Sequence, residues 1–133
     1  GPTPNTEAMA DDKEDVDVRL EDQQRINAFG RLNGRMHEVE EDMKAKQSEY
    51  DLLDEACDEI ALADGDEPVR YMFGECFFEM TQEQADERLE EQKAKCQEEI
   101  DGYKAEMKNI QDTLADLKSQ LYGRFGKNIN LEE

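Results

Sequence analysis

Residues 89–121 read LEEQKAKCQEEIDGYKAEMKNIQDTLADLKSQL, and a mainly apolar stripe runs through them in steps of four and three residues. Its positions are Leu89, Lys93, Cys96, Ile100, Tyr103, Met107, Ile110, Leu114, Leu117 and Leu121. Such alternating steps make a seven-residue repeat, which keeps the stripe on one side of an α-helix. The residues between are mostly charged, as on the solvent-exposed faces of a coiled coil. The stretch therefore predicts one long helix that needs a partner helix.

A second stripe of nearly equal length lies earlier in the chain. Its two seven-residue series are Phe29, Met36, Met43, Tyr50 and Cys57, and Leu32, Val39, Lys46, Leu53 and Ile60. Equal lengths predict that the two helices fold back on each other as an antiparallel coiled coil. We expect facing residues to have numbers that sum to about 150, which places Met43 beside Met107. The polar Lys46 then lies along the ring of Tyr103 and helps to fix the register.

Local signals mark where the helices begin and end. The segment ADGDEP, residues 63–68, contains a glycine and a proline that stop the first helix. The segment TQEQ, residues 81–84, is a capping box in which Thr81 and Gln84 bond to each other's backbone at the start of the second helix. These signals predict helices over about residues 21–63 and about residues 82–124.

The segment VRYMFGECFFEM, residues 69–80, is the one stretch typical of β-structure. Two short aromatic-rich runs flank Gly74 and predict a two-stranded hairpin with apolar side chains on both faces. A lone hairpin is marginally stable in water, and its open edges can pair with strands of other chains. We therefore expect the hairpin to assemble with other subunits. The alternative is a small hydrophobic cap folded over the end of the coiled coil.

Composition excludes several classes of protein. The 133 residues include 36 acidic and 16 basic side chains, a net charge of -20, and only 36% are hydrophobic. Binding nucleic acid or an anionic membrane needs a basic face, so neither is expected. The three cysteines lack a CxxC pattern and no secretory signal opens the chain, which favours reduced thiols and a cytoplasmic location. Residues 1–15 are expected to be a tag remnant and a disordered acidic arm, before a single domain over residues 16–133.

No pattern in the sequence indicates catalysis. His37 is the only histidine, and it lies on a charged helix without a nucleophile or a second base near it in sequence. The DGDE segment at residues 64–67 lacks the ligand spacing of a calcium loop. There is no glycine-rich phosphate loop. We therefore expect no enzyme activity, no catalytic residues, no metal site and no cofactor.

Four segments resemble the β-type subunits of the prefoldin family in amino-acid sequence. They are EDQQRINAF at residues 21–29, EACDEIALAD at 55–64, TQEQADERLEEQ at 81–92 and LADLKSQLYGRFGKNINLEE at 114–133. The resemblance runs from about residue 16 to the C-terminus. It implies a mainly α fold, a long antiparallel coiled-coil hairpin of two helices joined by one β-hairpin that enters an inter-subunit β-barrel. It also implies a hetero-hexamer of two α-type and four β-type subunits.

The resemblance implies a co-chaperone that captures non-native proteins of the actin and tubulin type and delivers them to the cytosolic chaperonin without ATP. The implied assembly surface consists of Val69, Tyr71, Met72, Phe73, Cys76, Phe77, Phe78 and Met80. The implied client-binding tip consists of Val16, Val18, Leu20, Ile26, Phe29, Leu121, Tyr122, Phe125, Ile129 and Leu131. Several tip residues could instead extend the coiled-coil core.

Two other classes of function remain open on the residues alone. A structural spacer or tether could use the same coiled coil and dimerise through the hairpin. An acidic chaperone of the histone-binding type would also account for the net charge of -20.

Overall fold

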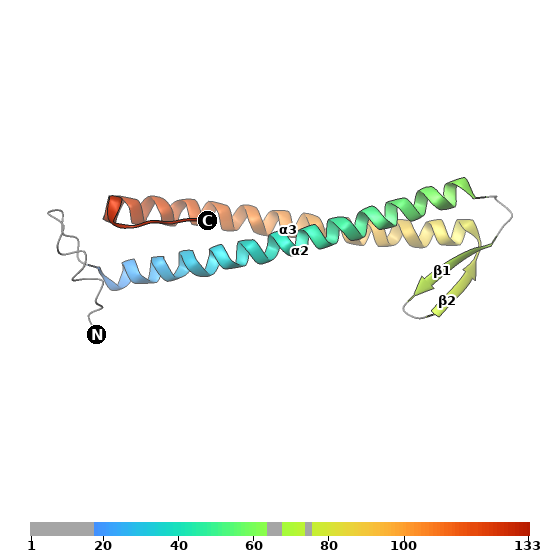
Figure 1. Cartoon of the computed structure of the whole chain (residues 1–133), viewed down its shortest axis with the longest axis horizontal. Helices are drawn as coiled ribbons and strands as arrows, with labels where there is room; N and C mark the ends of the chain where they lie inside the picture. Colours follow the sequence, from blue (N-terminus) through green and yellow to red (C-terminus); the bar gives the residue numbers. More distant parts are fainter. Residues whose placement is uncertain (1–17, 64–67, 74–75) are drawn as a thin grey trace. The chain divides into compact units, whose positions relative to one another are not determined.

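The computed structural model describes residues 18–63, 68–73 and 76–133, and Figure 1 shows the course of the chain. The elements are α2 (Leu20–Leu62), β1 (Val69–Phe73), β2 (Cys76–Met80), α3 (Gln82–Phe125) and the short 3-10 helix η1 (Gly126–Asn128). The predicted fold of two long helices joined by one β-hairpin is confirmed. The expected acidic arm, Val16, the helix-ending turn at residues 64–67 and the turn at Gly74 lie outside the described residues.

The chain divides into two compact units, which are described separately. The described residues of the terminal unit are 18–39 and 106–133. The hairpin unit contains residues 40–105. Within the described parts of both units, no helix is long and apolar enough to cross a membrane.

The core of the terminal unit is built from the two apolar stripes. Its buried cluster consists of Phe29, Met36, Ile110, Leu114, Leu121, Phe125 and Leu131. The partly buried residues packed against this cluster are Val18, Ile26, Leu32, Leu117 and Ile129. Most of these residues belong to the seven-residue repeats, which explains why α2 and α3 remain helical over this length despite their high charge. We call this set the terminal cluster.

The hairpin unit has a thinner apolar core and a well-defined start to α3. Among the side chains of this unit that the structure describes, the buried apolar ones are Ala85, Leu89, Cys96 and Ile100. The predicted capping box is present, since the Thr81 backbone N–H donates to Gln84 Oε1 at 3.1 Å and the Gln84 N–H donates to Thr81 Oγ1 at 3.1 Å. Reciprocal bonds of this kind satisfy backbone groups that the first helical turn leaves unpaired.

The two strands form an antiparallel two-stranded sheet. Their backbone register places Val69 opposite Met80, Met72 opposite Phe77, and Phe73 opposite Cys76. The hairpin predicted from VRYMFGECFFEM is therefore present, with a two-residue connection between its strands.

The predicted register of the two helices is wrong by about one turn. Cross-helix contacts in the terminal unit join Asp22 to Arg124 and Arg35 to Glu106, and those in the hairpin unit join Lys46 to Glu99 and Asp54 to Lys93. The paired numbers sum to 146, 141, 145 and 147 in that order. A sum of 146 sets nine of the ten positions of the first stripe opposite a position of the second stripe, whereas 150 does so for only one seven-residue series.

The expected pairing of Lys46 with Tyr103 is corrected by the same shift. Lys46 Nζ instead lies 2.6 Å from Glu99 and 3.0 Å from Glu49. The ammonium group that lies over a tyrosine ring is that of Lys93, 5.4 Å from the centre of the Tyr50 ring. Both lysines therefore carry their charge to the edge of the helix pair while their stems cover apolar surface.

A buried ion pair ties the start of α2 to the end of α3 in the terminal unit. The Asp22 side chain is 1% exposed and accepts hydrogen bonds from Arg124 Nη2 at 2.6 Å and Arg124 Nε at 3.0 Å. It also accepts the Arg19 backbone N–H at 3.0 Å, so it caps its own helix. The hydrogen bonds from Arg124 are the main reason why the pKa of Asp22 lies below its ordinary value of 3.8.

Replacing a buried stripe residue should destabilise the chain far more than replacing an exposed leucine. Leu114 is 0% exposed, so Leu114→Ala leaves a cavity and should cost about 2–5 kcal/mol of unfolding free energy. Leu52 is 66% exposed and its replacement by Ala should change stability by less than about 0.5 kcal/mol. Urea unfolding followed by circular dichroism measures both. Equal losses would contradict the assigned core.

The ion pair between Asp22 and Arg124 should make the free energy of unfolding depend on pH in the acidic range. Because the pKa of Asp22 is lower in the folded state, its stabilisation is complete above the ordinary value of 3.8 and is lost as pH falls below that value. Asp22→Asn should therefore cost about 1–3 kcal/mol at pH 7 and progressively less below pH 4. The exposed Asp112, which forms a surface ion pair with Lys108 at 3.4 Å, serves as the control in Asp112→Asn. A pH-independent loss for Asp22→Asn would contradict the role of its charge.

Candidate functional site

The terminal unit brings most of the predicted tip residues together. Phe29, Leu121, Phe125 and Leu131 are buried members of the terminal cluster. The tip residues that pack against this cluster are Val18, Ile26 and Ile129. Two further tip residues are exposed: Leu20 at 73% and Tyr122 at 39%. The predicted set is thus a mixture of a shared apolar core and an exposed apolar rim around it.

The residues after α3 turn back along the terminal unit. Gly126, the first residue of η1, has a φ of +55°, a conformation that glycine adopts without the steric cost of a side chain. We call residues 129–133 the C-terminal strap, and Figure 1 shows it returning alongside α3. The Leu131 backbone N–H donates to Tyr122 Oη at 3.2 Å, and Asn33 Nδ2 donates to the Glu132 carbonyl oxygen at 3.1 Å.

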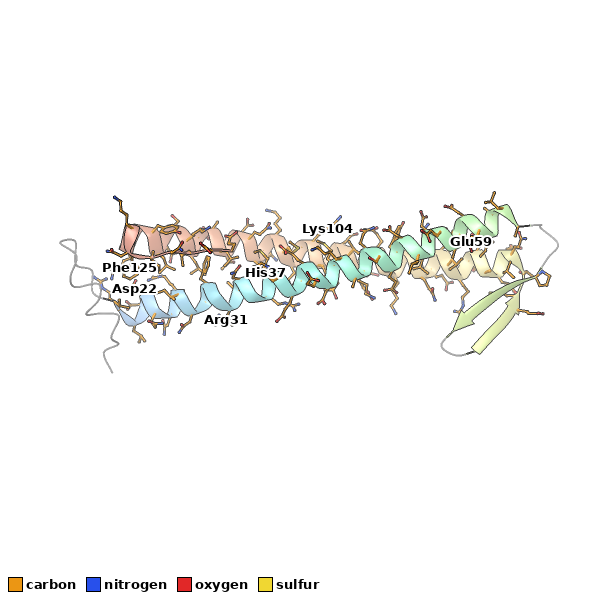
Figure 2. All side chains as sticks on the ribbon, in the orientation of Figure 1. Asp22, Arg31, His37, Glu59, Lys104 and Phe125 are labelled. Atoms are coloured by element: carbon orange, nitrogen blue, oxygen red, sulfur yellow. The ribbon has the colours of Figure 1, made fainter. Side chains whose placement is uncertain are left out.

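Sequence reasoning did not identify Asp22, Asn33 or Arg124 as parts of this region. Figure 2 shows Asp22 and Phe125 near each other at the two helix ends. Asp22 is the third residue of α2 and could have been noticed as an acidic capping residue, because carboxylates at that position satisfy free N–H groups. Its partner Arg124 follows only from the correct register. No sequence signal indicates that Asn33 contacts the strap.

The hairpin unit carries polar residues at stripe positions. Lys93 Nζ donates to Asp54 Oδ1 at 2.9 Å, and this hydrogen bond raises the lysine pKa. The hydrogen bond to Glu99 likewise raises the pKa of Lys46. The Cys96 thiol is buried and donates to the Lys46 carbonyl oxygen at 3.2 Å. These groups are paired locally, as a polar residue in a coiled-coil seam must be.

Three possible metal ligands lie together in the hairpin unit. The ligand atoms of Cys57, Asp86 and Glu90 are all within 4.8 Å of one another. Burial is the main cause that raises the pKa of the Cys57 thiol, which opposes the thiolate form that a metal ion needs. Both carboxylates are exposed. These properties are those of a hydrated surface cluster.

The predicted assembly residues form the two strands. Val69 and Met80, at the outer ends of β1 and β2, are half-buried and lie opposite each other. The strand register also pairs Tyr71 with Phe78 and Met72 with Phe77. Within the described part of the chain the sheet has only these two strands, so each strand has one unpaired edge.

Comparisons with known proteins agree with this architecture. A family profile described as prefoldin subunit matches residues 23–128. The chain is 48% identical to prefoldin subunit 4 of Homo sapiens over 120 residues, covering 90% of this chain and 90% of the relative. It is 47% identical to prefoldin subunit 4 of Bos taurus with the same coverage.

A solved structure shares the fold at much lower sequence identity. The crystal structure of the prefoldin beta subunit from Thermococcus strain KS-1 matches with a TM-score of 0.76 and 17% identity, covering 84% of this chain and 97% of that chain. At this identity the likeness establishes the fold alone. The profile and the sequence identities establish more: this chain belongs to the prefoldin subunit family.

Proposed function

We propose that the chain is a β-type subunit of a hetero-hexameric prefoldin co-chaperone. The observation that carries this proposal is the 48% identity to a prefoldin subunit across 90% of both chains. The two-stranded sheet supports it, because isolated hairpins are marginal in water and open edges favour pairing with other strands. In this proposal two α-type and four β-type subunits join their hairpins in a β-barrel platform, and residues 16–133 act as one domain.

The hairpin residues are proposed as the assembly surface. They are Val69, Tyr71, Met72, Phe73, Cys76, Phe77, Phe78 and Met80. Both faces of such a hairpin carry large apolar side chains by sequence alternation, which suits burial between neighbouring subunits. Few other positions in so acidic a chain offer comparable apolar density.

The terminal unit is proposed as the site that holds non-native clients. Leu20 and Tyr122 are exposed side chains with large apolar parts beside a buried apolar cluster, and the carboxylate of Glu21 lies next to Leu20 in sequence. Exposed apolar groups can hold unfolded segments without sequence preference, and nearby charges keep the complex in solution. Binding of this kind uses no nucleotide and no catalytic residue. Transfer of clients, of the actin and tubulin type, to a cytosolic chaperonin completes the proposed role in the cytoplasm.

Removing two apolar hairpin side chains should prevent assembly without unfolding the helices. We expect Met72→Ser combined with Phe77→Ser to weaken entry into the hetero-hexamer about a thousandfold, since central apolar residues of interfaces each contribute about 2 kcal/mol. Native mass spectrometry after mixing with the other prefoldin subunits gives the hexamer fraction, and circular dichroism checks helicity. Leu52→Ser, at an exposed position of α2, is the control. Normal assembly of the double variant would contradict the proposed surface.

Replacing an exposed apolar residue of the terminal unit should weaken client holding. Leu20→Ser removes a side chain that is 73% exposed, so stability should change little. Protection of a denatured protein against aggregation by the assembled hexamer should need several-fold more complex, consistent with about 1 kcal/mol of lost apolar contact. Leu52→Ser is again the matched control, since Leu52 is 66% exposed in the other unit. Equal protection by both variants would remove Leu20 from the client-binding site.

A further inference from the structure

The C-terminal strap has the properties of a bound peptide. Ile129 packs against the terminal cluster and Leu131, two residues later, is 8% exposed within it. The backbone of Ile129 is extended, with φ -134° and ψ 144°. An extended chain places residues two apart on the same side, so Ile129 and Leu131 can both face the cluster.

Few polar contacts hold the strap in place. Tyr122 Oη accepts the Leu131 N–H at 3.2 Å, and Asn33 Nδ2 donates to the Glu132 carbonyl oxygen at 3.1 Å. Lys118 Nζ lies 3.5 Å from Glu133 Oε1, with both side chains more than a third exposed. An ion pair this exposed contributes little in water. The strap therefore depends on two apolar side chains and two hydrogen bonds.

One polar atom beside the strap remains unsatisfied. Asn33 Oδ1 is buried and has no hydrogen-bond partner among the described residues. Buried acceptors without a partner are unusual and cost free energy. The strap uses the donor half of the Asn33 amide and leaves the acceptor half unused. A different extended chain that presents a backbone N–H at this position would satisfy both halves.

We propose that the strap occupies a binding seat for extended segments of client proteins and is displaced when a client binds. The seat consists of the terminal cluster without Ile129 and Leu131, together with the side chains of Asn33, Lys118 and Tyr122. Its occupant is an extended segment with two apolar side chains two residues apart, followed by acidic residues, as in the strap sequence INLEE. This inference rests on the proposed client-holding function and specifies how one part of that site selects its ligand.

The displacement reverses the role that the sequence suggested for two tip residues. If Ile129 and Leu131 bind clients directly, replacing them weakens client binding. If they belong to a strap that covers the seat, replacing them exposes the seat and strengthens binding. The apparent affinity of a covered site is reduced in proportion to the fraction of molecules in which it is open. The two roles therefore predict opposite signs.

The test measures binding of a fluorescein-labelled peptide, GKNINLEE, the sequence of residues 126–133, to the full chain by fluorescence anisotropy. We expect the strap-release variant, Ile129→Ser with Leu131→Ser, to bind the peptide about tenfold more tightly than the unchanged chain. A control peptide with serine at the positions of Ile129 and Leu131 should bind neither protein measurably. Equal or weaker binding of GKNINLEE by the release variant would overturn the proposal.

A second variant tests the strap without changing any side chain of the seat. Gly126 has a φ of +55°, so Gly126→Ala strains the backbone that returns the strap, and it should raise peptide affinity about fivefold. Gly102→Ala, the same change at a helical glycine of the hairpin unit, should leave the affinity unchanged. Identical affinities for the two alanine variants would count against the strap, even if the double serine variant failed to fold.

The assay also separates this inference from its nearest rival and from the proposed function. A strap that seats on a second copy of the chain would make the unchanged chain a dimer in sedimentation analysis and the release variant a monomer, which would overturn displacement within one chain. Peptide binding to the single chain requires neither hexamer assembly nor an aggregating client. A negative peptide result would therefore leave protection by the hexamer intact, whereas loss of that protection in the Leu20→Ser hexamer bears on the client site as a whole.

Discussion

Two apolar stripes that repeat every seven residues on highly charged helices have little surface to pack against except each other. This constraint accounts for most of the molecule, since most of the buried residues of α2 and α3 are stripe residues. Packing the stripes together leaves charged faces in water, which suits a chain with a net charge of -20. It also leaves little helical apolar surface for the two strands, so the constraint that forms the coiled coil is also the reason to propose other subunits as the partners of the hairpin.

The polar residues within the stripes are tolerated because each has a partner at the edge of the helix pair. Lys46 reaches Glu99 and Lys93 reaches Asp54, and neither ammonium group is left without an anion. Such residues add little to stability but disfavour registers in which they would face apolar neighbours. The buried Asp22 differs from them, since it combines capping of α2 with a two-point bond to Arg124. It therefore couples the ends of two helices that are about a hundred residues apart in sequence.

The sequence predicts the elements well and their mutual alignment poorly, for a physical reason. A seven-residue repeat, the Thr81 capping box and the alternating apolar strands are local patterns, and each determines its own secondary structure. The register depends on which turn of one helix faces which turn of the other, and shifts of about one turn still align one apolar series. The contact between Asp22 and Arg124 could not be anticipated without that register. The return of Ile129 and Leu131 onto the cluster depends on the backbone at Gly126, which composition does not reveal.

A protein that holds non-native chains through exposed apolar groups must also avoid binding itself. The charge of -20 acts between molecules at a distance, since like-charged surfaces repel before apolar groups can meet. Salt screens that repulsion beyond about 8 Å at physiological ionic strength, so a segment that covers the apolar surface directly gives further protection. A strap of the same chain can cover the apolar surface in this way, because its effective concentration there is high. Its few contacts limit the stability of the closed state, so a client can still displace it. Under the proposed function, the seat would then be covered when no client is present and open to any segment that binds it better than INLEE.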